Sequence, residues 1–394
     1  MAKRNESVEP GLSYLQELGL KYASTKETVI RKLSAVIGRD QAYRILKEID
    51  RRAEKGADSL TDRSFYEMKN RDYAASINLT GLIDGDIIRK ACNWITGNKS
   101  LFGKEVLDIG CDCGIVSCFL ARALPDSQIT AIDRCKEAIS VAGQLADRLK
   151  LNNITFVASA AEEMPSRKFN TVFSMRTLGE NSGNNRDDYP VFENFVTQAD
   201  YMSAKISKYS SAVASLIKDD GTLVSIERCQ IDPLLLAWID ALNKDGLRFL
   251  SHDRLSCAEQ KVQSYFAVVT AIKETSAQQQ DILSFFSDVV EDEADVNVPI
   301  YEGEKADWYL LRNKGQFIKG VTAYNTEGKK LGRYGLWMSS RDETALLIYQ
   351  ADLEKRSLGV YDISLKEELL EALENMVKNT DLSKDVRFVG FFDR

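Results

Sequence analysis

The 394-residue sequence lacks any apolar run near the roughly 18–20 residues that a membrane span requires. Its first ten residues, MAKRNESVEP, have no apolar core behind them, so we expect no secretory signal. The net charge of −7 argues against a protein that coats nucleic acid. Seven cysteines, an odd number scattered along the chain, predict free thiols in a reducing compartment. We therefore expect a globular protein of the cytoplasm with no membrane partner.

Histidine is nearly absent, since His252 is the single one in the sequence. It is either a base, if its segment folds over a site, or a surface or hydrogen-bonded side chain, and the second interpretation is favoured. Cys111, Cys113 and Cys118 lie close together, but no second cluster of cysteine or histidine complements them. We interpret these three as small buried hydrophobic side chains and expect no metal site.

Changes of pattern divide the chain into four predicted parts. Residues 1–98 have helical apolar spacing almost throughout, which predicts a helical cap over a site or, as the alternative, helices packed against the sheet edge. Residues 99–275 alternate short apolar strands with helices. Residues 276–304 are polar and acidic and predict a linker, and residues 305–394 predict a small α+β domain on an antiparallel meander, without a chemical motif. The elements expected in this last domain are strands over Trp308–Arg312, Phe317–Tyr324, Leu331–Ser339, Thr344–Gln350, Ser357–Ile363 and Val386–Phe392, and a helix over Leu365–Lys378.

The most informative stretch is Lys104–Ala123, KEVLDIGCDCGIVSCFLARA. An apolar run ends in a turn with Gly110 and Gly114, and from Ile115 the apolar period becomes that of a helix. This change of period across a glycine-bearing turn predicts a strand that leads into a helix. The first turn of such a helix offers free N–H groups to an anionic or polar ligand. We therefore expect a ligand site at this turn.

Short apolar strands separated by helices imply a mostly parallel sheet covered on both faces. The strands expected are Glu105–Gly110, Gln128–Asp133, Ile154–Ser159, Phe169–Met175, Gly221–Arg228, Leu247–Ser251 and Ser264–Ile272. Ligands of such sheets lie outside the carboxyl ends of the strands, where the strand order reverses. This rule places Asp108–Gly114, Asp133, Ser159–Glu163 and Met175–Asn181 around one crevice.

Four motifs occur in order within residues 101–274. They are VLDIGCDCG at 106–114, ITAID at 129–133, FVASAAEEMP at 156–165 and DDGTLV at 219–224. Together they resemble the class I S-adenosylmethionine-dependent methyltransferases. The resemblance implies an α/β fold with a Rossmann-like, seven-stranded, mostly parallel sheet, and S-adenosylmethionine as cofactor. A nicotinamide enzyme would instead show GxGxxG, whereas the glycines here lie four apart.

The resemblance also implies roles for individual residues. Gly110 and Gly114 would let the backbone approach the amino-acid part of the cofactor. Asp133 would accept hydrogen bonds from both ribose hydroxyls, or would be only a helix N-cap. Asp108 would support the turn and face the cofactor's ammonium group, or would only cap the turn. The full set of predicted cofactor-binding residues is Asp108, Gly110, Cys111, Asp112, Gly114, Asp133, Arg134, Ala160, Ala161, Glu162 and Met175.

Three positions depart from the family pattern. One of them, Asn170, stands where the family often has an aspartate, and we expect only a structural effect from this change. Asp112 stands where the family often has its middle glycine, although aspartate tolerates unusual backbone angles. Ala160 replaces an acid that often binds the adenine amino group, and that contact is then lost or passes to Glu162. Ala161 and Glu162 would flank the adenine, while the alternative for Glu162 and Glu163 is a pair of solvated acids in a first helical turn.

The acceptor side is expected at Met175–Asn181. We predict Glu180 as base or substrate ligand and Arg176 as anchor for an anionic group, against the alternative of a local Arg–Glu pair. Tyr66 and Tyr73 would either close the site as a lid or simply pack. The signature Asn-Pro-Pro-Tyr, typical of family members that methylate amino groups of bases or glutamine, is absent.

The predicted function is methyl transfer to an unidentified acceptor, with a small molecule preferred and RNA or protein left open. A slight basic excess in the first hundred residues is the single feature that favours RNA. The alternative from another class is a non-catalytic scaffold that binds S-adenosylmethionine, suggested by Asp112 and Ala160. The oligomeric state is left open.

Overall fold

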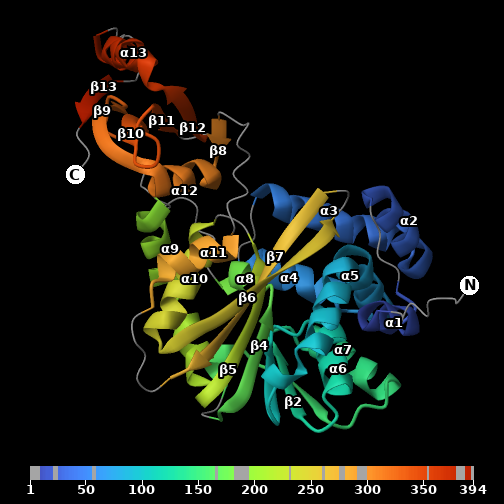
Figure 1. Ribbon diagram of the computed structural model, residues 1–394. Helices are drawn as coiled ribbons and strands as arrows, with labels where there is room; N and C mark the ends of the chain where they lie inside the picture. Colours follow the sequence, from blue (N-terminus) through green and yellow to red (C-terminus); the bar gives the residue numbers. More distant parts are fainter. Residues whose placement is uncertain are drawn as a thin grey trace, which may run out of the picture. The chain divides into compact units, whose positions relative to one another are not determined.

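The computed structural model describes residues 9–20, 25–55, 59–164, 167–181, 195–229, 232–259, 262–274, 280–290, 300–352, 355–378 and 387–391. The chain forms two compact units (Figure 1). The first comprises Met1–Asn185, Ser203–Gln230 and Leu234–Val290, and the second comprises Arg186–Met202, Ile231–Pro233 and Glu291–Arg394. The boundaries expected at residues 98, 275 and 304 stay predictions, and residues 276–279 and 291–299 of the acidic linker lie outside the described residues.

The first unit is built on a seven-stranded sheet of order β3-β2-β1-β4-β5-β7-β6. Its strands are β1 (Glu105–Ile109), β2 (Gln128–Asp133), β3 (Ile154–Ala158), β4 (Phe169–Met175), β5 (Ile217–Arg228), β6 (Leu247–Glu259) and β7 (Val262–Lys273). Strands β1 to β5 are parallel, and β7 runs antiparallel to both of its neighbours. This confirms the predicted fold class. The strand order reverses between β1 and β4, which is where such sheets bind ligands.

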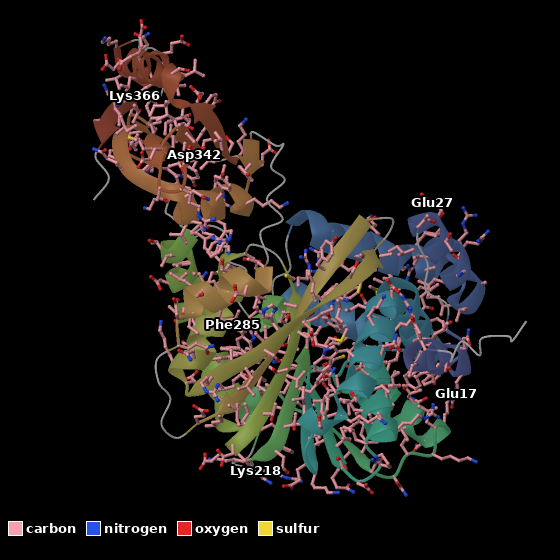
Figure 2. All side chains as sticks on the ribbon, viewed as in Figure 1. Glu17, Glu27, Lys218, Phe285, Asp342 and Lys366 are labelled. Carbon is pink, nitrogen blue, oxygen red and sulfur yellow. The ribbon has the colours of Figure 1, made fainter. Side chains whose placement is uncertain are left out.

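The segments between these strands form α6 (Ile115–Ala123), α7 (Lys136–Arg148), the 3-10 turn η2 (Ala161–Glu163), α8 (Leu178–Asn181), α9 (Phe195–Ser215) and α10 (Pro233–Lys244), and α11 (Ile282–Val290) follows β7. The part of α9 up to Met202 and the first residue of α10 belong to the second unit. The central strands are buried almost completely, from Val106 and Leu107 in β1 to Phe173 in β4. Side chains drawn in Figure 2 include Lys218, which donates a hydrogen bond to Glu105 at 2.5 Å at the amino ends of β5 and β1.

In the described part of the chain, the α-helices that precede the sheet are α1 (Pro10–Glu17), α2 (Lys26–Ile37), α3 (Arg39–Lys55), α4 (Ser59–Lys69) and α5 (Tyr73–Gly97). The α5 helix begins at an N-cap, Asp72, whose carboxylate accepts a hydrogen bond from the Ala75 N–H at 2.8 Å. A Cβ at Gly81, within this helix, would lie 3.1 Å from the Leu20 side chain, so the glycine permits close packing of the helix against Leu20.

The second unit is an antiparallel sheet of order β13-β9-β10-β11-β12-β8. Its elements are β8 (Ile300–Glu302), α12 (Glu304–Asn313), β9 (Lys314–Tyr324), β10 (Lys330–Ser339), β11 (Ala345–Asp352), β12 (Arg356–Asp362), α13 (Lys366–Lys378) and β13 (Arg387–Phe391). The strand expected over Trp308–Arg312 is wrong, because that segment is part of α12. Ala306 and Leu310, four residues apart, are both buried in one apolar cluster, which is helical spacing.

No helix among the described residues is both long enough and apolar enough to cross a membrane.

Candidate functional site

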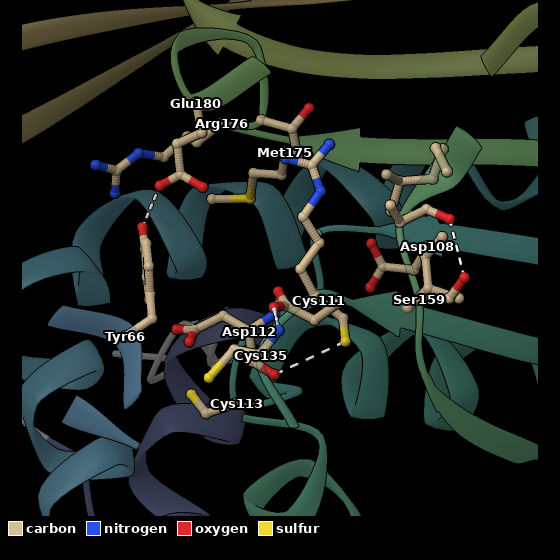
Figure 3. Close-up of a pocket in the computed structure, with 18 of the residues that line it drawn as sticks. Tyr66, Asp108, Cys111, Asp112, Cys113, Cys135, Ser159, Met175, Arg176 and Glu180 are labelled. Carbon is tan, nitrogen blue, oxygen red and sulfur yellow. Dashed lines mark hydrogen bonds between the residues drawn. The ribbon is translucent and has the colours of Figure 1, made fainter. Parts of the chain in front are cut away.

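A cavity of about 850 Å³ lies at the carboxyl ends of β1, β2 and β4 (Figure 3). Its wall also includes residues of η2, α8, α4 and α5. The volume falls in the range of small-molecule and cofactor sites. The predicted residues that line it are Asp108, Gly110, Cys111, Asp112, Asp133, Arg134, Ala160, Ala161, Glu162, Met175, Arg176 and Glu180. The crevice predicted from the four strand ends therefore exists as one cavity.

Gly114 is the one predicted site residue that does not line the cavity. Its φ is +78°, in the left-handed region, and it precedes the first residue of α6. A Cβ at this position would lie 2.6 Å from the Cβ of Ala142 in α7. The glycine thus allows the two helices to pack closely, and its predicted role at the cofactor stays a prediction.

Asp112 occupies the position where the family often has a glycine, and its φ is +45°. The residue thus adopts a left-handed backbone of the kind that glycine adopts freely, as the tolerance of aspartate for that region allows. Its backbone N–H donates a hydrogen bond to Oδ2 of Asp133 at 2.9 Å. The turn and the acid at the end of β2 are therefore connected directly.

The side chain of Asp112 points to the end of α4. The Lys69 ammonium forms an ion pair with it, and Nδ2 of Asn70 donates a hydrogen bond to its Oδ1 at 3.1 Å. Burial opposes ionisation here, but Lys69 holds the pKa of Asp112 below its ordinary value. Sequence reasoning missed Lys69 and Asn70, because 43 and 42 residues separate them from Asp112 and no local pattern marks them.

Asp133 is held by two backbone donors. Its Oδ1 accepts a hydrogen bond from the N–H of Cys135 at 2.8 Å, and its Oδ2 accepts the one from Asp112. Burial raises its pKa above the ordinary value. Cys135 is itself the N-cap residue of α7, so Asp133 does not fill the helix-capping role that was its alternative. Each carboxylate oxygen keeps a further lone pair for a ligand hydroxyl.

Asp108, at the end of β1, is only 3% exposed. Its Oδ2 accepts a hydrogen bond from the Ser117 hydroxyl at 2.5 Å, which ties the strand to α6. Burial raises the pKa of Asp108 to about 7. The side chain therefore connects two elements below the turn and also faces the cavity.

The side of the cavity expected to hold adenine contains a polar cluster. Nη2 of Arg134 donates hydrogen bonds to the Glu162 carboxylate at 3.3 Å and to Oδ1 of Asn181 at 2.7 Å. Glu162 lies in η2 beside the buried Ala161 and the exposed fraction of its side chain is 17%. Glu162 is therefore a paired residue of the cavity wall.

The acceptor side joins α8 to the N-terminal helices. The Tyr66 hydroxyl donates a hydrogen bond to Glu180, and the Arg176 guanidinium forms an ion pair with Asp84 (Figure 3 shows the first contact). These partners lie in α4 and α5, far from α8 in sequence. Tyr73 does not line the cavity. It packs instead, with the guanidinium carbon of Arg148 3.9 Å from the centre of its ring.

Glu227, at the carboxyl end of β5, is a further buried acid that sequence reasoning missed. It accepts hydrogen bonds from the N–H groups of Thr177 and Leu178 at 3.1 and 3.3 Å. Burial raises its pKa to about 7. The Thr177 hydroxyl lies 2.8 Å from the hydroxyl of Tyr209, which lines the cavity. Glu227 thus fixes the turn from which Arg176 and Glu180 project.

His252 and the cysteines take the structural roles that were favoured. His252 pairs with Val269 in the β6–β7 ladder, packs its ring edge-on 5.9 Å from that of Phe285, and does not line the cavity. All seven cysteines are free, and all but the half-buried Cys135 are buried. Among the described residues, no group of three His, Cys, Asp or Glu side chains has the arrangement of a metal site.

A family model described as a methyltransferase domain matches residues 102–310, about half of the chain. The chain belongs to this family. Its cofactor is S-adenosylmethionine. The match covers the whole parallel sheet, including the turn at Gly110 and the acid at Asp133.

Curated relatives match only part of the chain. The release factor glutamine methyltransferase of Buchnera aphidicola is 34% identical over 99 residues, 25% of this chain and 36% of the relative. The ribosomal RNA small subunit methyltransferase G of Shewanella frigidimarina is 33% identical over 113 residues, which are 28% of this chain and 54% of the relative. The ubiquinone biosynthesis O-methyltransferase of Pseudomonas putida is 39% identical over 89 residues, which are 22% of this chain and 37% of the relative. The chain therefore spans about a third to a half of the length of these relatives.

Among solved structures, the magnesium protoporphyrin IX methyltransferase of Synechocystis PCC 6803 covers 63% of this chain and 99% of its own, at 17% identity and a TM-score of 0.35. A SAM-dependent methyltransferase from Aquifex aeolicus covers 44% of this chain and 86% of its own, at 17% identity and a TM-score of 0.33.

Proposed function

We propose that the protein transfers the methyl group of S-adenosylmethionine to a small acceptor bound beside Tyr66, Arg176 and Glu180. The observation that carries the proposal is that one cavity collects Asp133, the glycine turn and η2 together with Glu180 and Arg176. These segments lie far apart in sequence and supply different chemistry to the same space.

The residues present fit the cofactor. Asp133 offers a remaining lone pair on each oxygen to the two ribose hydroxyls. Ala161 and Glu162 border the side where the adenine would lie, and the turn from Gly110 to Asp112 borders the amino-acid part. When bound, S-adenosylmethionine supplies a methyl group whose bond to sulfur breaks as the bond to the acceptor forms.

Glu180 is the proposed base. Its carboxylate would take the proton that an O–H or N–H acceptor loses on methylation, and the Tyr66 hydroxyl orients that carboxylate. Arg176, held by Asp84, would anchor an anionic group of the acceptor. Positioning of the acceptor in line with the methyl group supplies much of the rate in such a reaction.

A small acceptor is favoured over RNA because the N-terminal helices cover the acceptor side of the cavity, beside Glu180. Tyr66 of α4 contacts Glu180 in α8, and Asp84 of α5 contacts Arg176 in the turn before α8, so side chains from the N-terminal helices narrow the space beside Glu180. The names of the relatives refer to protein, RNA and small-molecule acceptors, so they do not favour one class of acceptor.

Calorimetric titration with S-adenosylhomocysteine tests cofactor binding. We expect saturable binding to the wild type, a loss of about 10-fold or more in affinity for Asp133→Ala, and no change for Asp126→Ala. Asp126 is an exposed aspartate of the α6–β2 connection and is the matched control. An Asp133→Ala variant that binds as well as the wild type contradicts the proposed site.

A methyl-label screen with small-molecule, RNA and protein fractions of a cell extract tests catalysis. Label in the small-molecule fraction supports the proposal, and Glu180→Gln should then lower turnover while it leaves the affinity for S-adenosylhomocysteine unchanged. Label confined to RNA or protein overturns the acceptor class. Cofactor binding without turnover in any fraction would identify a scaffold instead.

A further inference from the structure

Lys69 is a buried cation that the proposed chemistry does not use. It is the last residue of α4, it is 6% exposed, and it lines the cavity. An ammonium group has three N–H donors. In the part of the chain that the structure describes, its contacts are the Asp112 carboxylate and the face of the Tyr66 ring, whose centre lies 5.6 Å from Nζ. The ammonium therefore keeps donors for a ligand.

Lys69 differs from the other cations in the cavity wall. Arg134 is paired with Glu162 and Arg176 with Asp84. The remaining two, Lys136 and Lys208, are exposed. Lys69 is thus the buried positive charge of the wall among the described residues, and it lies at the turn from Gly110 to Gly114.

The acids around this turn create a need for such a cation. Asp108, Asp112 and Asp133 all line the same part of the wall, so a ligand carboxylate that entered there alone would meet negative charge. Lys69 offsets Asp112 and can donate to a second carboxylate at the same time. Asn70 keeps this arrangement in place, because it binds Asp112 through its Nδ2 and accepts a hydrogen bond from Ser76 through its Oδ1.

We propose that Lys69 binds the carboxylate of the amino-acid part of S-adenosylmethionine, with Asp112 and Asn70 as positioning residues. This inference rests on the proposed placement of the cofactor in the cavity. It makes the N-terminal helices a part of the cofactor site, because α4 would supply one of its charged ligands. It also explains why the family glycine is replaced by an aspartate that reaches α4.

The test compares two ligands on the full-length protein by calorimetry. S-Adenosylhomocysteine has the carboxylate, whereas 5′-methylthioadenosine has the same nucleoside and thioether without the amino-acid part. We expect Lys69→Met to weaken binding of S-adenosylhomocysteine by about 10- to 100-fold, as expected for one buried charge-assisted hydrogen bond. The affinity for 5′-methylthioadenosine should change by less than about 2-fold. Lys47→Met, at an exposed lysine of α3, is the control and should leave both affinities unchanged.

Other outcomes overturn the inference. Unchanged binding of S-adenosylhomocysteine by Lys69→Met would show that Lys69 does not contact the cofactor, and an equal loss for both ligands would show that it only supports the turn. A wild-type protein that binds neither ligand would instead refute the proposed function. If Lys69→Met alone does not fold, the double variant Lys69→Met/Asp112→Asn removes both charges of the pair. Against Asp112→Asn as reference, it should show the same selective loss.

Discussion

The contact between α6 and α7 at Gly114 gives a quantitative prediction. An alanine there would hold a left-handed backbone, which costs about 1–2 kcal/mol for a residue with a Cβ. Its Cβ would also lie 2.6 Å from the Cβ of Ala142 and 3.1 Å from Cε1 of Phe156, and such overpacking costs about 1–3 kcal/mol. Gly114→Ala should therefore lower the free energy of unfolding by about 2–5 kcal/mol.

Two variants of α7 separate these contributions. Gly143 has nothing within 4 Å of an added Cβ, so Gly143→Ala should stabilise the protein by about 0.5–1 kcal/mol through helix propensity alone. Ala142→Gly removes the nearest clashing atom, so Gly114→Ala should cost about 1 kcal/mol less in that background than in the wild type. The backbone contribution should remain in both backgrounds.

Urea denaturation followed by circular dichroism measures these changes, with the signal of the first unit analysed separately if two transitions appear. A loss below about 0.5 kcal/mol for Gly114→Ala would refute the reasoning, since neither strain nor clash would then be present. Strict additivity of Gly114→Ala with Ala142→Gly would show that the two helices do not meet at these residues.

Three further predictions concern buried charges and thiols. Burial raises the pKa of Glu227 in the folded protein to about 7, so unfolding between pH 4.5 and 7 releases its proton. The free energy of unfolding should therefore fall by roughly 1.4 kcal/mol per pH unit in this range because of Glu227. Urea denaturation at several pH values should show a smaller slope for Glu227→Gln than for the wild type. In the second unit, Arg356→Met should lower the free energy of unfolding, measured by urea denaturation, by about 3–5 kcal/mol. The reason is that the Asp307 carboxylate, 2.7 Å from Nη1 of Arg356, has no exposed side-chain area. A decrease of less than about 1 kcal/mol would contradict this prediction. Ellman's reagent should modify at most Cys135 in the native protein, because the other cysteines are buried. The reaction should be slow, since burial raises the pKa of the Cys135 thiol to about 11. S-Adenosylhomocysteine should protect Cys135 from the reagent, because this residue lines the cavity.

The parallel sheet could be predicted because its signals are local. Each central strand is a short apolar run, and Asp133 ends the strand that follows the glycine turn, as the resemblance to the family predicts. The same reasoning brought Glu162, Arg176 and Glu180 to one edge before any contact between them was known. Parallel strands align their carboxyl ends, so strand assignment alone implies this proximity.

Contacts between distant segments could not be predicted in this way. Asp112 was recognised as a departure from the family, but its partner Lys69 lies 43 residues away and carries no motif. The local pair of Arg176 with Glu180, considered as the alternative for the acceptor side, is another example, because the structure pairs Arg176 with Asp84 and Glu180 with Tyr66. Such pairs depend on how α4 and α5 pack over the turn, which periodicity does not report.

The error in the second unit has a different origin. Residues Trp308 to Arg312 are apolar enough to resemble a strand when the window is short. The buried positions Ala306 and Leu310 lie four apart, and Asp307 between them is buried through hydrogen bonds with Tyr349 and Arg356. An aspartate interrupts an apolar run in sequence, yet its buried partners make it part of the interior.

The most direct test of the central claim is a crystal structure of the protein with S-adenosylhomocysteine. We predict the ligand in the cavity at the carboxyl ends of β1, β2 and β4, with its ribose hydroxyls within hydrogen-bond distance of the Asp133 carboxylate. The adenine should lie against Ala161 and Glu162. A ligand bound elsewhere on the chain, or one bound in the cavity with its ribose away from Asp133, would contradict the account.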